Sequence, residues 1–420
     1  MSSPALHPDR DRLRELFPRV RRFTETLCEP LELEDYVVQS MPDASPTKWH
    51  LAHTSWFFET FVLARAGVGY APIDPRYAYL FNSYYHAAGE RHPQAERGAL
   101  SRPTVAEVLA YRRHVDRAMH RVLDSAPSAV FDELAFVVEL GLNHEEQHQE
   151  LIVTDVKHVL ATNPLAPAYV AAPASTRSTP ARLHWVALDG GSADVGARAA
   201  GFAFDNERPR HPVLVAPFEL ANRPASCAEY LEFIGDGGYA RSELWLSDGW
   251  DACQRHGWSA PLYWQQVDGE WTHATLHGAR AIDPAEPVCH VSYYEADAFA
   301  RWAGARLPLE AEWEHAAEGC EAAGNFVESG RFHPAPAADS ARLVQMFGDV
   351  WEWTASPYQP YPGFAPFPGV LGEYNGKFMI NRVVLRGGSC ATPARHIRSS
   401  YRNFFLPDAR WQFSGVRLTR

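Results

Sequence analysis

The stretch GLNHEEQHQELIVTDVKHVL, residues 141–160, combines a helical pattern with two histidines placed one turn apart. Apolar residues recur at three- and four-residue intervals throughout 129–160, which predicts one long helix. On a helix, His144 and His148 lie about 40° apart around the axis and about 6 Å apart along it, so both imidazoles can reach one metal ion. The stretch therefore predicts a helix whose two histidines either bind one metal ion or are solvated on its surface.

Residues 144–148 read HEEQH, which fits the H-E-x-x-H pattern of zinc peptidases. A metzincin would continue with glycine at 151 and histidine at 154, where this chain has Leu151 and Thr154. A peptidase that takes a later glutamate as its third ligand needs an acidic residue soon afterwards, but residues 162–183 contain none. The sequence thus argues against a peptidase, and the third ligand has to come from another part of the chain.

Outward from this stretch, the chain divides into two halves. Helical periodicity also covers 10–27, 50–65 and 104–123, which together with 129–160 predicts a four-helix bundle. After an Ala/Pro/Ser/Thr-rich stretch, the rest of the chain is rich in Gly, Trp and Pro, and only 294–304 and 309–319 look helical. The predicted class is α+β, with a bundle over 1–161, a linker over 162–182 and a loop-dominated domain over 183–420.

Composition limits the kinds of partner. The net charge is -12 and no basic tract compensates for it, which argues against nucleic acid and membrane surfaces and favours small-molecule chemistry. The first 17 residues lack the apolar core of a signal peptide, so we expect a cytoplasmic protein. The six cysteines show no C-x-x-C spacing, and reduced, buried thiols are expected.

The second predicted helix offers the missing ligand. Its sequence contains His50 and His53 three residues apart, ahead of an apolar helix face, and either could complete the site. Three imidazoles from two helices of one bundle would leave one side of the metal open. An open site suits the binding of substrate and dioxygen better than a closed structural zinc site does.

Several motifs occur together in a fixed order, and as a set they resemble one family. SPTKWHLAHTSWFFETF, FNSYYHAAGERHP and NHEEQHQEL are followed by RLPLEAEWEHAA, FGDVWEWT, LRGGS and FSGVRL. Over nearly the whole chain this set resembles the iron(II) sulfoxide synthases of ergothioneine biosynthesis. The resemblance implies a DinB-like four-helix bundle followed by a domain similar to the formylglycine-generating enzyme, which is itself related to C-type lectins.

The resemblance also implies a cofactor and a reaction. Iron(II) would be held by His53, His144 and His148, with His50 at a position where relatives can have a non-ligand. Such enzymes use dioxygen to join a thiol to C2 of the imidazole of hercynine, the trimethylated betaine of histidine, and they release a sulfoxide. Gln147 would face hercynine, because an amide can hydrogen-bond an imidazole nitrogen.

The resemblance further implies a role for Tyr84 and Tyr85. One branch of the family has a tyrosine pair here beside the iron, whereas other branches take the catalytic tyrosine from the C-terminal domain. A phenol at this place can donate a proton during dioxygen chemistry.

The sulfur donor is predicted from the C-terminal stretch. Relatives that use γ-glutamylcysteine have Asn-Trp-Asp where this chain has Asn403-Phe404-Phe405. Because the aspartate that helps to bind that donor is absent, cysteine is the expected donor. We expect Asn403 to hold hercynine and Phe404 to face its trimethylammonium group. The candidates for the donor carboxylate are Arg97 and Arg402, with Arg91 as a third.

Four other functions compete with this one. A copper oxidase that makes formylglycine needs a thiol pair near the GGS strand, where only Cys390 is present. A binding module without activity would not need the histidines, the glutamine and the tyrosine pair to be intact. Selenoneine synthases, which use a selenosugar, and ovothiol-type enzymes, which use histidine, share the architecture and stay open as alternatives.

Overall fold

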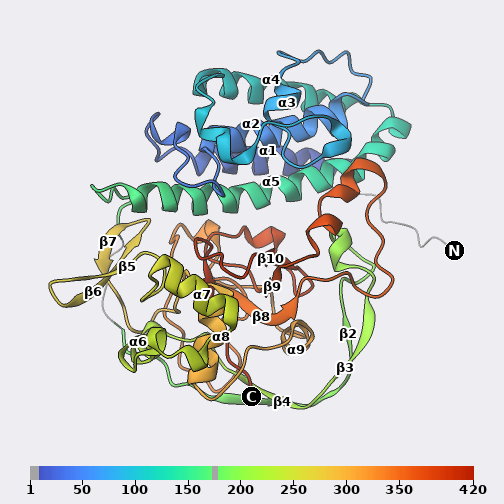
Figure 1. Ribbon diagram of the computed structural model, residues 1–420. Coiled ribbons are helices and arrows are strands. Elements are labelled where there is room, and N and C mark those ends of the chain that lie inside the picture. Colours follow the sequence, from blue (N-terminus) through green and yellow to red (C-terminus); the bar gives the residue numbers. More distant parts are fainter. Residues whose placement is uncertain (1–8, 173–177) are drawn as a thin grey trace. The chain divides into compact units, whose positions relative to one another are not determined.

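A computed structural model describes residues 9–172 and 178–420 (Figure 1), so the first eight residues and residues 173–177 of the predicted linker lie outside the described residues. The described chain divides into two compact units. The first unit comprises the residues up to Thr162 together with Arg198–Phe204 and Pro366–Tyr374, and the second comprises the remainder. Within the described ranges, no helix has the length and apolar character needed to cross a membrane.

The first unit is the predicted helical bundle, and the predicted fold class is confirmed. Asp9 caps the first helix through its side chain, and Thr104 and Glu107 form a reciprocal capping box at the start of another, so polar residues mark where these helices begin. The helices are α1 (Arg10–Thr26), α2 (Thr47–Phe58), the short α3 (Tyr77–Leu80), α4 (Val105–Ser125) and α5 (Ser128–Thr162). A π-helical turn, Glu59–Leu63, continues α2.

Helix α5 lies along α1 and α2 (Figure 1), and a glycine allows the close approach to α2. A methyl group on Gly141 would lie 2.6 Å from Cε1 of Phe58 and 2.9 Å from Cε1 of Phe57, well inside van der Waals contact. Both phenylalanines are fully buried. The absent side chain at 141 therefore sets how closely the two helices pack, one turn before His144.

Two segments from the C-terminal half of the sequence belong to the first unit. The carboxylate of Glu373 accepts hydrogen bonds from the backbone N–H groups of His86 and Ala87, both at 2.9 Å. The ring of Phe136 on α5 meets Phe367 edge-on, with centroids 5.0 Å apart. These contacts bring Tyr374, the residue after Glu373, to the bundle.

The second unit contains several small sheets. In the largest, with strand order β10-β9-β8-β11, β11 runs parallel to β8 and the other neighbours are antiparallel. The strands are β1 (Trp185–Leu188), β2 (Gly191–Val195), β3 (His211–Val215), β4 (Phe218–Ala221), β5 (Trp264–Val267), β6 (Glu270–Thr275), β7 (Gly278–Ala281), β8 (Trp351–Pro357), β9 (Val383–Arg386), β10 (Asn403–Phe405) and β11 (Ser414–Gly415). The other sheets are β1-β4, β2-β3 and β5-β6-β7.

The expectation that only two segments of this half are helical was wrong. Besides α8 (Tyr293–Trp302) and α9 (Glu310–Ala316), the chain forms α6 (Cys227–Gly235) and α7 (Ser247–His256). Helix α6 starts at a capping box of Ser226 and Glu229, a signal that the sequence does contain. Helix α7 includes Gly249, a weak helix former that packs directly against Tyr294, so tertiary contact overrides propensity there.

Candidate metal centre

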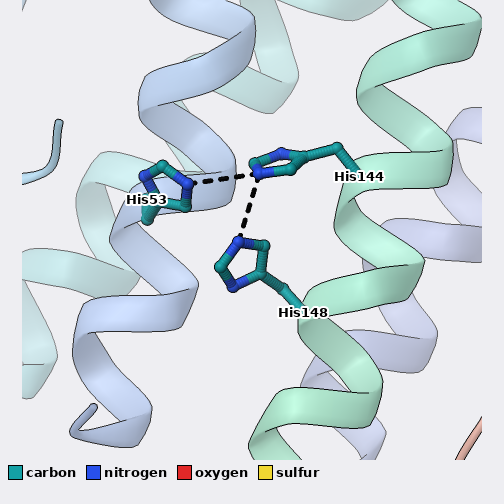
Figure 2. A group of neighbouring side chains, drawn as sticks. All are labelled: His53, His144 and His148. Carbon is teal, nitrogen blue, oxygen red and sulfur yellow. Dashed lines mark hydrogen bonds between the residues drawn. The ribbon is translucent and has the colours of Figure 1, made fainter. Parts of the chain in front are cut away.

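Helices α2 and α5 bring three histidines together (Figure 2). His53 comes from α2, and His144 and His148 come from successive turns of α5. Nε2 of His144 lies 3.2 Å from Nε2 of His53 and 3.1 Å from Nε2 of His148, and all three side chains are buried. The Nε2 atoms thus converge on one point, as predicted for three imidazoles around one ion.

The protonation of these rings favours a cation at that point. Burial is the main cause that lowers the pKa of His144 to about 3 and the pKa of His53 and of His148 well below the usual range, so all three are neutral at neutral pH. Nδ1 of His53 lies 2.6 Å from the carbonyl oxygen of Phe81 and donates to it, which leaves a lone pair on Nε2. One proton on His144 cannot satisfy both neighbouring Nε2 atoms, whereas a divalent metal ion satisfies all three.

His50, the other candidate third ligand, points elsewhere. Its Nδ1 lies 2.8 Å from Nδ1 of His148 and its Nε2 lies 3.0 Å from Oδ2 of Asp155. It therefore contacts the outer side of one histidine of the triad and does not reach the common point.

The glutamate of the H-E-x-x-H pattern is held away from the triad by two arginines. Glu145 is fully buried and pairs with Arg112 at 2.5 Å and with Arg21 at 2.8 Å. Burial alone would raise the pKa of Glu145, but the two guanidinium groups lower it to about 2. A peptidase needs this glutamate as a general base beside the metal, so the ion pairs agree with the argument against a peptidase.

An aromatic ring and a charged group stack in a row behind His53. The indole of Trp49 lies parallel to the imidazole, with centroids 4.6 Å apart and an interplanar angle of 11°. The guanidinium carbon of Arg97 lies 3.4 Å from the centre of the indole, and Nη1 donates to Oγ of Ser45 at 2.8 Å. Burial, and then Arg91, lower the pKa of Arg97 to about 9. Nε of Arg97 has no hydrogen-bond partner among the described residues, so this buried cation can accept an anion.

Tyrosines gather on another side of the triad. The rings of Tyr84 and Tyr85 lie 4.8 Å apart, and Tyr84 stacks on Tyr374 at 5.2 Å. The Tyr374 hydroxyl donates to Oε1 of Gln147 at 3.0 Å, and its ring centroid is 6.5 Å from that of His144. Burial, with Tyr85 and Tyr374 as neighbours, raises the pKa of Tyr84 well above its usual value, so this phenol keeps its proton at neutral pH.

Tyr374 lies beside Gln147 in the structure, although no motif in the sequence points to it. It lies 227 residues after Gln147 in the chain, in a stretch without helical or strand periodicity. The GEYNG sequence around it contains no motif that indicates a partner. Only the packing of residues 366–374 on the bundle identifies it.

The predicted C-terminal residues lie in the second unit. Arg402 is buried and pairs with Glu310 at 2.7 Å, and its Nη1 donates to the carbonyl of Asn206 at 2.8 Å. Phe404 stacks on Tyr358 with centroids 4.0 Å apart. Oδ1 of Asn403 accepts from the backbone N–H of Phe404 at 2.9 Å. The centroid of Phe405 lies 6.2 Å from the ring of Trp411.

The described residues contain a second buried group with metal-ligand side chains, formed by His273, Glu286 and His333. Here a protein cation is already in place, because Arg280 pairs with Glu286 and its Nε donates to Nε2 of His273 at 3.3 Å. Nε2 of His333 lies 3.0 Å from Oε2 of Glu286. We interpret this group as a buried ion-pair network that holds the second unit together.

The sequence matches two domain families. Residues 16–152 match the DinB superfamily, and residues 171–342 and 337–420 match the Sulfatase-modifying factor enzyme 1-like domain. The class is thus a DinB bundle joined to a formylglycine-generating-enzyme-like domain.

Similarity to whole proteins narrows this class to one family. The chain is 35% identical to "Hercynine oxygenase" of Mycobacterium tuberculosis, over 90% of this chain and 91% of that protein. It is 34% identical to "Hercynine oxygenase" of Mycolicibacterium thermoresistibile, over 90% and 87% of the two chains. The chain belongs to the hercynine oxygenase family. The chain is also 31% identical to the "Formylglycine-generating enzyme" of M. tuberculosis, but this match covers only 43% of the chain and 76% of that protein.

Proposed function

We propose that this chain is an iron(II)-dependent hercynine oxygenase that joins L-cysteine to hercynine. A C–H bond of hercynine and the S–H bond of the thiol are replaced by a C–S bond, the sulfur gains one oxygen atom, and the other oxygen atom leaves as water. Dioxygen thereby accepts all four electrons and no further reductant is needed. The observation that carries the proposal is the buried triad of His53, His144 and His148 in a chain of this family.

The triad is suited to iron(II). Three neutral imidazoles do not cancel the charge of the ion, and nitrogen ligands of this kind suit iron as well as zinc. Iron(II), when bound, supplies the binding and reduction of dioxygen. The absence of a carboxylate from the triad also agrees with a site that has to bind an anionic thiolate.

We assign the tyrosines and Gln147 to the hercynine side of the reaction. The Gln147 amide accepts from Tyr374 through Oε1, so its orientation is fixed, and its Nε2–H group is the donor for the substrate imidazole. Tyr84 keeps its proton at neutral pH and, with Tyr85 beside it, is the candidate proton donor to reduced oxygen. We therefore propose that the chain is a member of the tyrosine-pair branch of the family.

We assign the carboxylate of the sulfur donor to Arg97. Its buried guanidinium bonds the neutral hydroxyl of Ser45 and makes no direct ion pair among the described residues, with the Asp155 carboxylate as a more distant neighbour. Arg402, by contrast, already pairs with Glu310, and Arg91 donates to the carbonyl of Ser83 at 2.7 Å. Nε of Arg97 has no hydrogen-bond partner among the described residues, so this buried cation gains from a bound anion.

The residues of the C-terminal strand β10 are further candidates for substrate contacts. We propose that Phe404, which stacks on Tyr358, faces the trimethylammonium group of hercynine, and that Asn403 holds the same substrate. We further propose that Phe405 replaces the aspartate with which relatives bind a γ-glutamyl donor, which favours cysteine.

The test is a competition between sulfur donors. Purified protein is loaded with iron(II) without oxygen, and then mixed with hercynine, cysteine, γ-glutamylcysteine and a selenosugar in aerated buffer, with products resolved by mass spectrometry. We expect hercynyl cysteine sulfoxide, with cysteine preferred at least about tenfold in kcat/KM, because one unpaired buried polar group costs about 1–3 kcal/mol. The His144→Ala protein is the control and should give no sulfoxide.

Each other product pattern contradicts one part of the proposal. Preference for γ-glutamylcysteine would refute the role of Phe405 while the oxygenase activity stands. Coupling of the selenosugar alone would make the chain a selenoneine synthase. If histidine, supplied in a parallel reaction in place of hercynine, is the better acceptor, the chain is an ovothiol-type enzyme.

A further inference from the structure

His148 is contacted on its outer side by a second imidazole, and a carboxylate lies behind that one. Nδ1 of His148 lies 2.8 Å from Nδ1 of His50, and Nε2 of His50 lies 3.0 Å from Oδ2 of Asp155. We propose that His50 and Asp155 are positioning residues, which fix the ring orientation and the tautomer of His148 so that its Nε2 lone pair faces the metal. The inference rests on the metal site of the proposed function.

The direction of each hydrogen bond follows from the carboxylate. Asp155, when ionised, can only accept, so the proton between it and His50 is on Nε2 of His50. In the arrangement that we propose, Nδ1 of His50 then accepts the proton on Nδ1 of His148. With that proton on Nδ1, the neutral His148 has its lone pair on Nε2, which is the atom that meets His144. The chain of bonds thus selects the tautomer that a metal ligand requires.

The outer end of this chain is fixed to the backbone. Oδ2 of Asp155 also accepts from the backbone N–H of Ser45 at 2.8 Å, just before α2 begins. The side chains of Asp155, His50 and His148 are all buried, so water does not compete for these bonds. Asp155 and His148 lie on α5, whereas His50 lies on α2, so the bonds also tie the two helices together.

The three histidines of the triad are supported differently. Nδ1 of His53 donates to a backbone carbonyl, that of Phe81, which no substitution removes. Nδ1 of His144 has no hydrogen-bond partner among the described residues. His148 alone in the triad depends on another side chain, so its support can be removed without altering any of the three rings.

The experiment measures metal affinity, with Co(II) in place of iron(II) and without substrate or oxygen. His50→Phe keeps a ring of similar size but cannot accept from His148, and His50→Gln restores one acceptor and one donor on a single amide. We expect His50→Phe to lower Co(II) affinity by roughly 10- to 100-fold, as loss of such outer partners typically does, and His50→Gln to recover most of it. Asp155→Ala should follow His50→Phe, and Asp155→Asn should be milder because its amide oxygen can still accept.

A matched control separates positioning from general damage. His114→Phe removes a histidine of α4 whose Nε2 lies 2.9 Å from the carbonyl oxygen of Ala71, and should leave Co(II) affinity unchanged. Paramagnetic proton NMR of the Co(II) protein supplies a second readout. The Nδ1 proton of His148 should be visible and slow to exchange in the wild type, and should exchange quickly in His50→Phe.

The possible results are distinguishable. Wild-type affinity for Co(II) in both His50→Phe and Asp155→Ala would overturn the positioning role. If His50→Gln loses the metal as completely as His148→Ala while His53→Ala retains it, His50 is itself a ligand and the inference is wrong. A wild-type protein that binds no Co(II) would refute the metal site of the proposed function, and the positioning role with it.

Discussion

Gly141→Ala is a change of one methyl group that should disturb the metal centre without touching a ligand. The new methyl carbon would lie 2.6 Å from Cε1 of Phe58, about 1 Å inside ordinary contact between carbons. Overpacking of this size costs about 1–3 kcal/mol, whereas the better helix propensity of alanine returns only about 1 kcal/mol. The strain is relieved if α5 moves away from α2, and that movement separates His53 from His144 and His148.

The magnitude follows from which state can relax. Without metal the helices can separate, whereas the bound ion requires the Nε2 atoms to converge, so most of the 1–3 kcal/mol should appear as lost metal affinity. That range corresponds to roughly 5- to 150-fold weaker binding. Anaerobic competition between the protein and a colorimetric chelator for Co(II) measures it. Gly235→Ala is the matched control, because a methyl group at that helical glycine meets no atom within 4 Å.

A second substitution tests the assigned cause. Phe58→Leu removes the ring edge that the new methyl group would strike, so the double variant Gly141→Ala/Phe58→Leu should bind Co(II) more tightly than Gly141→Ala alone. Unchanged affinity in Gly141→Ala would refute the idea that this contact sets the helix spacing. A loss that Phe58→Leu does not reduce would assign the effect to some other contact of α5.

Three further predictions concern residues around the triad. Tyr84→Phe and Tyr85→Phe each keep the ring and remove the hydroxyl. Metal and substrate binding should therefore persist, while the yield of sulfoxide falls and uncoupled oxidation of the thiol rises. Sulfoxide turnover equal to that of the wild type in both single variants and in the double variant would refute the role of these tyrosines as proton donors. Arg97→Met should raise KM for cysteine roughly 10- to 100-fold, because hydrogen bonds to a charged group contribute about 1.5–3 kcal/mol, and it should leave Co(II) affinity unchanged. An unaltered KM would mean that another residue binds the carboxylate of the donor. Glu145→Gln should cost about 1.5–3 kcal/mol of stability in chemical denaturation, because two buried guanidinium groups lose their shared anion and keep only Asp116 and Glu25, and a variant as stable as the wild type would contradict that reasoning.

The helical bundle could be predicted from the sequence because the patterns that indicate its helices are local. Apolar periodicity along 129–160 and the spacing of His144 and His148 depend on residues less than two turns apart, and such patterns survive whatever packs around them. The same argument fails in the second half, where α7 forms around a glycine that only a tertiary contact explains. Short strands there contain too few residues for a period to be visible.

The residues around the triad were harder to predict from the sequence, because their positions depend on contacts between distant segments of the chain. The sequence placed His50 and His53 on one helix face but could not say which of them meets α5 at the level of His144. That outcome depends on the packing depth of the two helices, which Gly141 influences from the other helix. The hydrogen bond from Tyr374 to Gln147 and the ion pair that engages Arg402 likewise follow from the folded chain alone.

The contribution of residues 366–374 to the first unit also has a consequence for how the protein is made. Gln147 leaves the ribosome 227 residues before Tyr374, which at about 5–20 residues per second is an interval of roughly 10 to 45 seconds. During this interval a nascent bundle already contains all three histidines of the triad but lacks the phenol that orients the glutamine. If the triad binds iron as proposed, an ion captured so early would meet dioxygen before Gln147 is oriented, so loading after the whole chain has folded is the safer order of assembly.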